Sequence, residues 1–292
     1  MAVKQTPAER KHMARDAAFD RRPIDPACPE EPGWREFTRR VALARRPEPE
    51  GTRSPRLKFL VAELGELREP FRRALQPPLA VPKAKERRIV ILLPGFGTSP
   101  WRMRYMARQL ERAGHKAKRW GMGFNLGVSP ELFETLSRRI EAVHERYGQP
   151  VVLIGWSLGG VFARELAREV PQMVRAVVTL GSPFSGDPHM NNVWRLYEWV
   201  AGHPVDAPPV LHYPDKPPVP TLAIWSRRDG IVAKRAARGL EGERDKEVEI
   251  GCSHMAFGVS RKAGQRIARE IEQFLKEVEE SSPGLGGGSP KD

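Results

Sequence analysis

Cysteine and long apolar runs are both scarce in this sequence. Cys28 and Cys252 are the only cysteines among 292 residues, which gives neither a disulfide framework nor the close spacing of a metal site. Residues 1–30 lack the apolar segment of a signal peptide, and no apolar run approaches the roughly 18 residues of a membrane-spanning helix. We therefore expect a cytoplasmic protein without a bound metal.

Acidic residues are too few to balance the basic ones. The chain has 49 Lys and Arg against 36 Asp and Glu, and residues 1–88 alone carry 21 against 13. A basic segment of this kind can contact anionic membranes or nucleic acids. The sequence has neither an aromatic-interleaved RNA-binding pattern nor zinc-finger spacing. We therefore predict no specific nucleic-acid partner and at most a weak electrostatic contact of the extension with anionic surfaces.

Proline is abundant, with 28 residues, and it breaks the first part of the chain into short pieces. Residues 1–56 are predicted to be a basic, Pro-rich and partly disordered extension with short helices near 8–19 and 34–44. Residues 57–75 have apolar residues at steps of three and four, which predicts an amphipathic helix lying on the main domain. The apolar face of this helix is expected to contain Leu57, Leu60, Val61, Leu64, Leu67, Phe71 and Leu75.

The domain organisation follows from these breaks. The helix and a Pro/Lys linker occupy 57–87, one domain spans 88–280 with a short cap insert at 184–219, and a flexible tail fills 281–292. In the domain, β-branched runs alternate with helical patterns, which predicts an α/β fold. This fold is a doubly wound, mostly parallel sheet with helices on both faces, and its ligands bind beyond the carboxyl ends of the strands. Strands are expected at 89–93, 115–120, 151–154, 174–180, 221–225 and 246–250, and helices at 103–113, 130–147, 161–169, 191–200 and 261–278.

A Gly-x-Ser-x-Gly motif lies between an apolar strand and a helix. It comprises Gly155, Trp156, Ser157, Leu158 and Gly159, and it follows the run 151–154. A strand, a sharp turn and a helix are the setting in which this motif forms a nucleophile elbow, with the serine exposed at the strand tip. The alternative is a glycine-rich strand-to-helix turn whose serine has no catalytic role. The elbow is favoured because suitable partners follow downstream.

A serine hydroxyl needs a base within hydrogen-bond reach, and the base needs an orienting acid. With a nucleophile elbow, the order along the chain is Ser, then Asp or Glu, then His. Asp229 and His254 fit this order, since each directly follows a predicted strand on the same edge of the sheet as Ser157. The alternatives are a plain turn at Asp229 and a structural loop histidine at His254. Rival bases and acids lie in the insert and fit the order or the strand ends less well: His189, His203, His212, Asp187, Asp206 and Asp215.

Attack by a serine creates an oxyanion, which needs preorganised N–H donors. The backbone N–H groups of Leu158, after the nucleophile, and of Phe96, in the turn after the strand 89–93, are the predicted donors. Glycines on both sides of Phe96 let the backbone approach a substrate closely. The glycine-rich loop 121–127 is interpreted as a wall of the active-site mouth rather than a dinucleotide site.

From about Arg88 to Leu275 the chain resembles an α/β-hydrolase of the compact lipase/esterase kind. The resemblance rests on the segments 153–160, 179–184, 229–232 and 253–254, and it is strongest to a bacterial family of poorly characterised hydrolases that share the segments 120–127 and 192–198. It implies hydrolysis of carboxylic esters through Ser157, Asp229 and His254. Many relatives have His-Gly at the oxyanion turn, where this chain has Pro94 and Gly95.

Aromatic residues of the insert and of the loop at the mouth are candidates for an acyl site. The predicted substrate-binding residues are Trp156, Phe124, Phe184, Trp194 and Tyr197; the alternative is that these rings hold a small satellite core. An apolar site suits a small acyl ester or a lipid, and a serine mechanism needs no cofactor. Other hypotheses are a thioesterase or acyltransferase on the same residues, or a non-catalytic binding protein with this fold.

Overall fold

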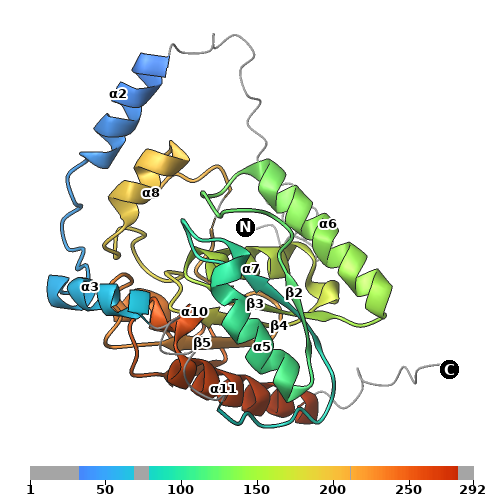
Figure 1. Cartoon of the computed structure of the whole chain (residues 1–292). Helices are drawn as coiled ribbons and strands as arrows, with labels where there is room; N and C mark the ends of the chain where they lie inside the picture. The colour runs from blue at the N-terminus through green and yellow to red at the C-terminus, as the bar shows by residue number, and fades with distance from the viewer. Residues whose placement is uncertain (1–32, 69–78, 211, 282–292) are drawn as a thin grey trace, which may run out of the picture.

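The computed structural model describes residues 33–68, 79–210 and 212–281, and the helix expected near 8–19 and the tail 281–292 lie outside this part except for Ser281. The chain folds around one parallel sheet covered by helices (Figure 1). None of the helices in the described part combines the length and the apolar character that crossing a bilayer requires.

The sheet has six strands, all parallel, in the order β2-β1-β3-β4-β5-β6. The doubly wound, mostly parallel sheet predicted from the sequence is therefore confirmed. Its strand boundaries differ from the expected ones by at most one residue at either end, except that the strand expected at 151–154 extends to Trp156. The strands are β1 (Ile89–Leu93), β2 (Lys116–Arg119), β3 (Val151–Trp156), β4 (Val174–Leu180), β5 (Thr221–Trp225) and β6 (Lys246–Glu249).

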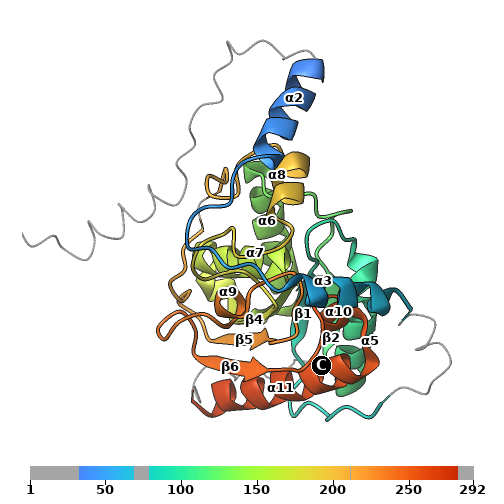
Figure 2. The same ribbon diagram turned by 90° about the vertical axis from the view of Figure 1, so that its left-hand side faces the viewer.

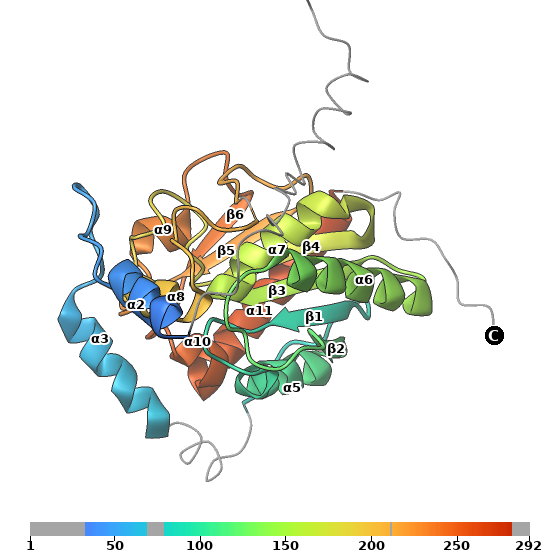
Figure 3. The same ribbon diagram turned by 90° about the horizontal axis from the view of Figure 1, so that it is seen from above.

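Helices cover both faces of the sheet. Alternate strand residues point to opposite sides, and because both sets are apolar, each face needs a covering layer. Val90 and Leu92 of β1 belong to a core shared with α5 (Arg104–Ala113) and α11 (Arg261–Glu280). Ile89 and Ile91 belong to a second core shared with α6 (Pro130–Tyr147) and α7 (Leu158–Glu169). Seen from above, α6 and α7 lie on one side of the strands and α5 and α11 on the other (Figure 3). The central strands β1 and β3 are consequently buried along their whole length.

Local sequence signals set the ends of these helices. The hydroxyl of Ser129 accepts a hydrogen bond from the N–H of Leu132 and so caps α6, which has Pro130 at its first position. Gly148 ends α6 with φ of 62°, and Gly114 ends α5 with φ of 117°. Glycine adopts this left-handed conformation without a steric penalty.

The two outer strands have a different composition from the central ones. In β2, Lys116, Lys118 and Arg119 leave only one apolar residue, and Lys116 and Lys118 lie over the ring of Tyr147, with their Nζ atoms 4.7 and 5.0 Å from its centroid. In β6 the sequence is Lys-Glu-Val-Glu. These strands have one open side each, so charged side chains remain partly solvated there.

Residues 33–68, here called the N-terminal arm, contact the main domain at several points. The arm contains α2 (Gly33–Ala44), which packs beside α8 (Trp194–Ala201) of the insert (Figures 1 and 2). The guanidinium of Arg40 donates to the carbonyl oxygen of Val200 at 2.7 Å, and that of Arg39 donates to Gly202 O at 2.8 Å. Arginine at the end of α8 satisfies carbonyl groups that have no partner within the helix.

The second helix of the arm corrects one expectation from the sequence. Only α3 (Leu57–Glu63) and a 3₁₀ turn (Leu64–Arg68) are described in the predicted helix 57–75, since residues 69–78 lie outside the described part. Leu57, Val61 and Leu64, expected to face the domain, are exposed, whereas Glu63 is buried. The helix does lie on the domain, but the predicted apolar contact face was wrong. The helix contacts the domain through its backbone and the Glu63 carboxylate rather than through a stripe of apolar side chains.

Candidate active site

The turn between β3 and α7 holds Ser157 in a strained conformation. With φ of 54°, Ser157 is the one non-glycine residue with positive φ in the described part of the chain. A side chain at Gly155 would put its Cβ 2.2 Å from the carbonyl oxygen of Gly159, and one at Gly159 would lie 2.3 Å from Leu93 O. The two glycines of the motif therefore permit the close approach of strand and helix that presents Ser157 at the strand tip.

Asp229 and His254 form a buried hydrogen-bonded pair beyond β5 and β6. Their Oδ2 and Nδ1 atoms are 2.7 Å apart, and both residues are buried. The other carboxylate oxygen of Asp229 accepts the N–H groups of Ile231 and Val232 at 2.8 and 2.7 Å. These bonds satisfy the carboxylate, fix its orientation, and favour the tautomer of His254 with the proton on Nδ1.

The end of β4 lies between Ser157 and this pair. The N–H of Ser157 donates to Leu180 O at 2.9 Å, and a Cβ on the next residue, Gly181, would lie 3.0 Å from Oδ2 of Asp229 and 3.1 Å from Nδ1 of His254. The structure thus brings the three predicted residues to one edge of the sheet. No hydrogen bond joins the described side chains of Ser157 and His254, and such bonds often tighten only when a substrate binds.

Two opposing effects act on the pKa of His254. Burial of the ring lowers the pKa, while the charge of Asp229, its hydrogen bond and the charge of Glu63 raise it. The sum raises the pKa of His254 above its ordinary value of 6.5. The rings of Trp156 and Phe257, which pack against the imidazole, are uncharged. An imidazolium at this position is consequently stabilised by carboxylates rather than by water.

The turn after β1 passes over the nucleophile. A Cβ at Gly95 would lie 3.1 Å from Cβ of Ser157, and in the described part of the chain the N–H of the next residue, Phe96, has no acceptor. The N–H of Leu158 is in the first turn of α7, where intrahelical acceptors are missing. The residues that carry the two predicted oxyanion donors therefore both lie close to Ser157.

Asn125 holds this turn in place and was missed by sequence reasoning. Its side-chain amide donates to Pro94 O at 2.8 Å, and its backbone exchanges hydrogen bonds with Gly97 and Thr98 at 2.7 and 2.9 Å. Asn125 is fully buried in the glycine-rich loop 121–127. A buried Asn in a loop of glycines was the available signal, because such an amide must find backbone partners.

An apolar cavity of about 120 Å³ opens beside Ser157. Phe96, Leu158, Trp194 and Tyr197 line it, together with Val128, Phe133, Val161, Phe162, Val193, Val205, Val210 and Val232. Among the predicted substrate residues, Trp156, Phe124 and Phe184 do not line it. Trp156 is buried, with its indole N–H donating to His254 O at 3.2 Å, Phe184 packs against the guanidinium of Arg164, and Phe124 is exposed.

The rival histidines of the insert have other partners. His212 contacts Glu165 and Phe184 O, and His203 contacts Tyr197 and Pro204 O. The Nδ1 atom of His189 lies 2.7 Å from Asp187 Oδ1, and its edge packs on Trp194. None of the three reaches Asp229, whose carboxylate is occupied by His254 and two backbone N–H groups.

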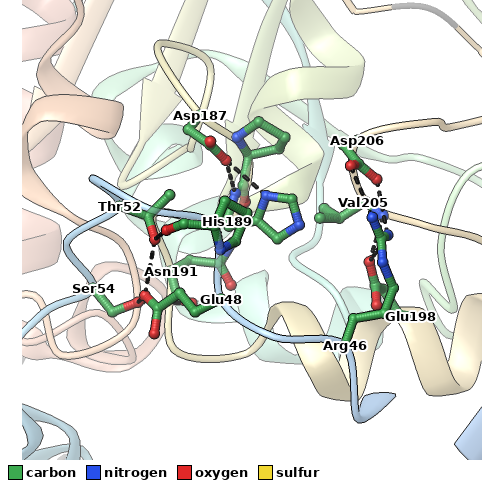
Figure 4. A network of polar contacts seen from close by, with 12 residues as sticks. Arg46, Glu48, Thr52, Ser54, Asp187, His189, Asn191, Glu198, Val205 and Asp206 are labelled. Atoms are coloured by element: carbon green, nitrogen blue, oxygen red, sulfur yellow. Dashed lines mark hydrogen bonds and ion pairs between the residues drawn. The ribbon is translucent and has the colours of Figure 1, made fainter. Parts of the chain in front are cut away.

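One group of side chains has the composition of a metal site. Ligand atoms of His189, Glu198 and Asp206 lie within 4.8 Å of one another. The guanidinium of Arg46 lies against both carboxylates, at 3.1 Å from Glu198 and at 3.0 and 3.1 Å from the two oxygens of Asp206 (Figure 4). Its hydrogen bonds lower the pKa of Asp206. We therefore interpret this group as an ion-pair network in which Arg46 supplies the cation and joins the arm to the insert.

Comparison with known proteins agrees with this architecture. The family described as the alpha/beta hydrolase fold matches residues 72–207 of the chain. A soluble variant of monoglyceride lipase from Saccharomyces cerevisiae, solved with a substrate analogue, is similar over 68% of this chain and 89% of its own, with 13% identity and a TM-score of 0.50.

Two further solved structures have lower TM-scores. The thioesterase RedJ of prodiginine biosynthesis from Streptomyces coelicolor has 16% identity and a TM-score of 0.47, and the monoacylglycerol lipase from Paleococcus ferrophilus has 16% and 0.46. Each is covered to 96%, over 68% of this chain. No curated protein matches the sequence. The match to the yeast lipase, at 13% identity, shows a shared fold and leaves the substrate open.

Proposed function

We propose that this chain, which has the α/β-hydrolase fold and matches the model of that family over residues 72–207, is a serine hydrolase of carboxylic acyl esters. The observation that carries the proposal is the buried Asp229–His254 hydrogen bond of 2.7 Å beside a strained Ser157. A hydrogen-bonded acid and base next to a serine is the arrangement that activates a serine hydroxyl.

In the proposed reaction, Oγ of Ser157 attacks the ester carbonyl carbon while Nε2 of His254 takes the hydroxyl proton. Asp229 keeps the imidazole oriented and stabilises the imidazolium. The N–H groups of Leu158 and Phe96 bind the oxyanion of the tetrahedral intermediate. His254 then returns the proton to the leaving alcohol oxygen, and the C–O bond breaks to leave an acyl-enzyme. Water, deprotonated by His254, attacks this ester and releases the acid and the free serine.

The cavity supports an apolar acyl group as the bound part of the substrate. Its walls are mainly valine, phenylalanine, leucine, proline and the rings of Trp194 and Tyr197, which offer an acyl chain dispersion contacts, and Glu165, Asn191 and His212 complete the lining. The same residues would also cleave a thioester. Comparing kcat/KM for an ester and a thioester that share one acyl chain would therefore distinguish an esterase from a thioesterase.

Labelling by a fluorophosphonate probe tests the proposal directly, because the probe reacts only with an activated nucleophile. We expect wild-type protein to be labelled and Ser157→Ala to remain unlabelled, as measured by in-gel fluorescence. Ser137→Ala is the control, since Ser137 is in α6 and its hydroxyl bonds Glu169 at the end of α7, away from the edge of the sheet that carries Ser157. A folded wild-type protein that takes no label, or label retained in Ser157→Ala, would contradict the proposal. A binding protein with this fold would give the first of these results.

The pH dependence of kcat/KM provides a second test. His254 must be neutral to act as base, and its pKa is raised above 6.5, so kcat/KM should rise with pH through an acid limb above that value. In Asp229→Asn the charge and the charge-assisted bond are lost while burial remains, so the limb should move to lower pH. A limb that stays in place in Asp229→Asn would show that another group controls it.

A further inference from the structure

The carboxylate of Glu63, in the N-terminal arm, lies between the two loops that carry Asp229 and His254. Its Oε1 atom accepts the N–H of His254 at 2.7 Å and that of Gly230 at 3.0 Å. Its Oε2 atom accepts the N–H of Met255 at 2.8 Å. One side chain thus bonds the backbone of both loops at the residues that form, or adjoin, the acid–base pair.

Burial shows that this contact is not an incidental surface interaction. Glu63 is 6% exposed, and a carboxylate is costly to bury unless charged hydrogen bonds replace its water. Gly230 packs against the backbone of α3 so closely that a Cβ on it would lie 2.4 Å from the carbonyl carbon of Phe59 and 2.6 Å from the N of Leu60. The absence of a side chain at position 230 is what brings the helix down onto the loop.

The loops have other connections nearer to the sheet. The hydroxyl of Ser226 donates to Cys252 O at 2.5 Å and accepts the N–H of Cys252 at 3.3 Å, which joins the two loops where they leave β5 and β6. Beyond that point, the Asp229–His254 bond and Glu63 connect the loop tips. Removal of the carboxylate would leave the Ser226–Cys252 bonds and the acid–base bond itself to hold the two loops together.

We propose that Glu63 is a positioning residue of the active site, whose carboxylate fixes the Asp229 and His254 loops relative to each other. The catalytic consequence of this role rests on the proposed hydrolase function. Asp229 and Glu63 are the charged groups of the described residues that act on the His254 ring, Asp229 through a hydrogen bond to Nδ1 and Glu63 from its bond to the backbone N–H, and they stabilise the imidazolium together. Part of the loop geometry and part of the electrostatic support of the base therefore come from the arm.

The substitution Glu63→Gln tests this role with almost no change in volume. The introduced amide keeps one oxygen acceptor but presents N–H groups to the remaining backbone N–H, and the negative charge beside His254 is lost. We expect kcat to fall by about 10- to 100-fold with KM little changed, as for a small misplacement of reacting groups. We also expect the acid limb of kcat/KM, and the NMR titration of the His254 ring, to move to lower pH.

Hydrogen exchange gives a readout that does not depend on activity. The amides of Gly230, His254 and Met255 should exchange faster in Glu63→Gln and faster still in Glu63→Ala. Glu48→Gln is the matched control, because Glu48 is in the same arm, is exposed, and bonds the hydroxyls of Thr52 and Ser54. Unchanged exchange and an unchanged His254 titration in Glu63→Gln would overturn the inference.

The two proposals fail in different ways. If wild-type protein takes no fluorophosphonate label while Glu63→Gln still alters the exchange of the three amides, hydrolysis is refuted and the role of Glu63 in the loops is supported. If wild type is labelled through Ser157 and Glu63→Gln retains wild-type kcat, acid limb and exchange, hydrolysis stands and the role of Glu63 is refuted.

Discussion

His254→Ala is expected to lower kcat/KM for an acyl ester by roughly 10⁵- to 10⁶-fold, since loss of the base leaves a neutral hydroxyl as the attacking group. The effect should fall on kcat, because the imidazole does not line the apolar cavity that would bind the acyl group. Steady-state hydrolysis of an activated aryl ester measures it. Asp229→Asn should lose about 10⁴-fold, because the base is retained but misoriented.

His144→Ala is the control for the histidine series. His144 is in the last turn of α6 and outside the edge of the sheet that carries Ser157, so this variant should retain wild-type activity. The series would contradict the proposed mechanism if His254→Ala kept more than a hundredth of the wild-type kcat/KM. Such a result would indicate that a different base serves Ser157 or that catalysis occurs elsewhere.

Gly155→Ala is expected to prevent formation of the native turn. The added Cβ would lie 2.2 Å from Gly159 O and 2.3 Å from Gly160 Cα, and both are backbone atoms that cannot move aside without dismantling the start of α7. Overpacking of this kind costs at least about 3 kcal/mol, a large share of the ~5–15 kcal/mol that stabilises a typical domain. We expect Tm to fall by roughly 10 °C or more, or the protein to be insoluble.

Gly251→Ala provides the comparison for the glycine experiment. A Cβ at Gly251, two residues after the end of β6, meets no atom within 4 Å, so Tm should stay within about 2 °C of the wild-type value. Thermal unfolding followed by circular dichroism measures both variants. Equal melting temperatures for Gly155→Ala and wild type would mean that the elbow is not packed as closely as the structure shows.

Local sequence patterns were sufficient to predict the parallel sheet and the order of the candidate catalytic residues along the chain. The β-branched run before Ser157 predicts a buried strand because both faces of β3 are covered, and the glycines mark a close approach that needs no tertiary information. Asp229 and His254 are found from the ends of predicted strands, since parallel strands present their carboxyl ends at one edge. Their roles in catalysis remain predictions for the experiments above.

Contacts between distant segments were not predictable in the same way. From the sequence alone, Glu63 is an ordinary solvent-exposed helix residue. The leucines around it predicted that the apolar face of the helix, and not the face with Glu63, would be buried. Its partners are backbone N–H groups of loops about 170 to 190 residues away, which leave no periodic signal in the sequence. Trp156 shows the same limit on a smaller scale, because strand alternation and not its aromatic character directs it into the core under His254.

The charged outer strands have a consequence for crowded solutions. An open strand edge presents unpaired N–H and C=O groups that can recruit another chain and start an aggregate. Here an incoming strand would have to pack its side chains against Lys116 and Lys118 on β2, or against Lys246 and Glu249 on β6, and strip water from them. The sheet thus combines apolar central strands with charged edge strands. The charged edges disfavour pairing with a strand of another chain beyond the six strands of the sheet.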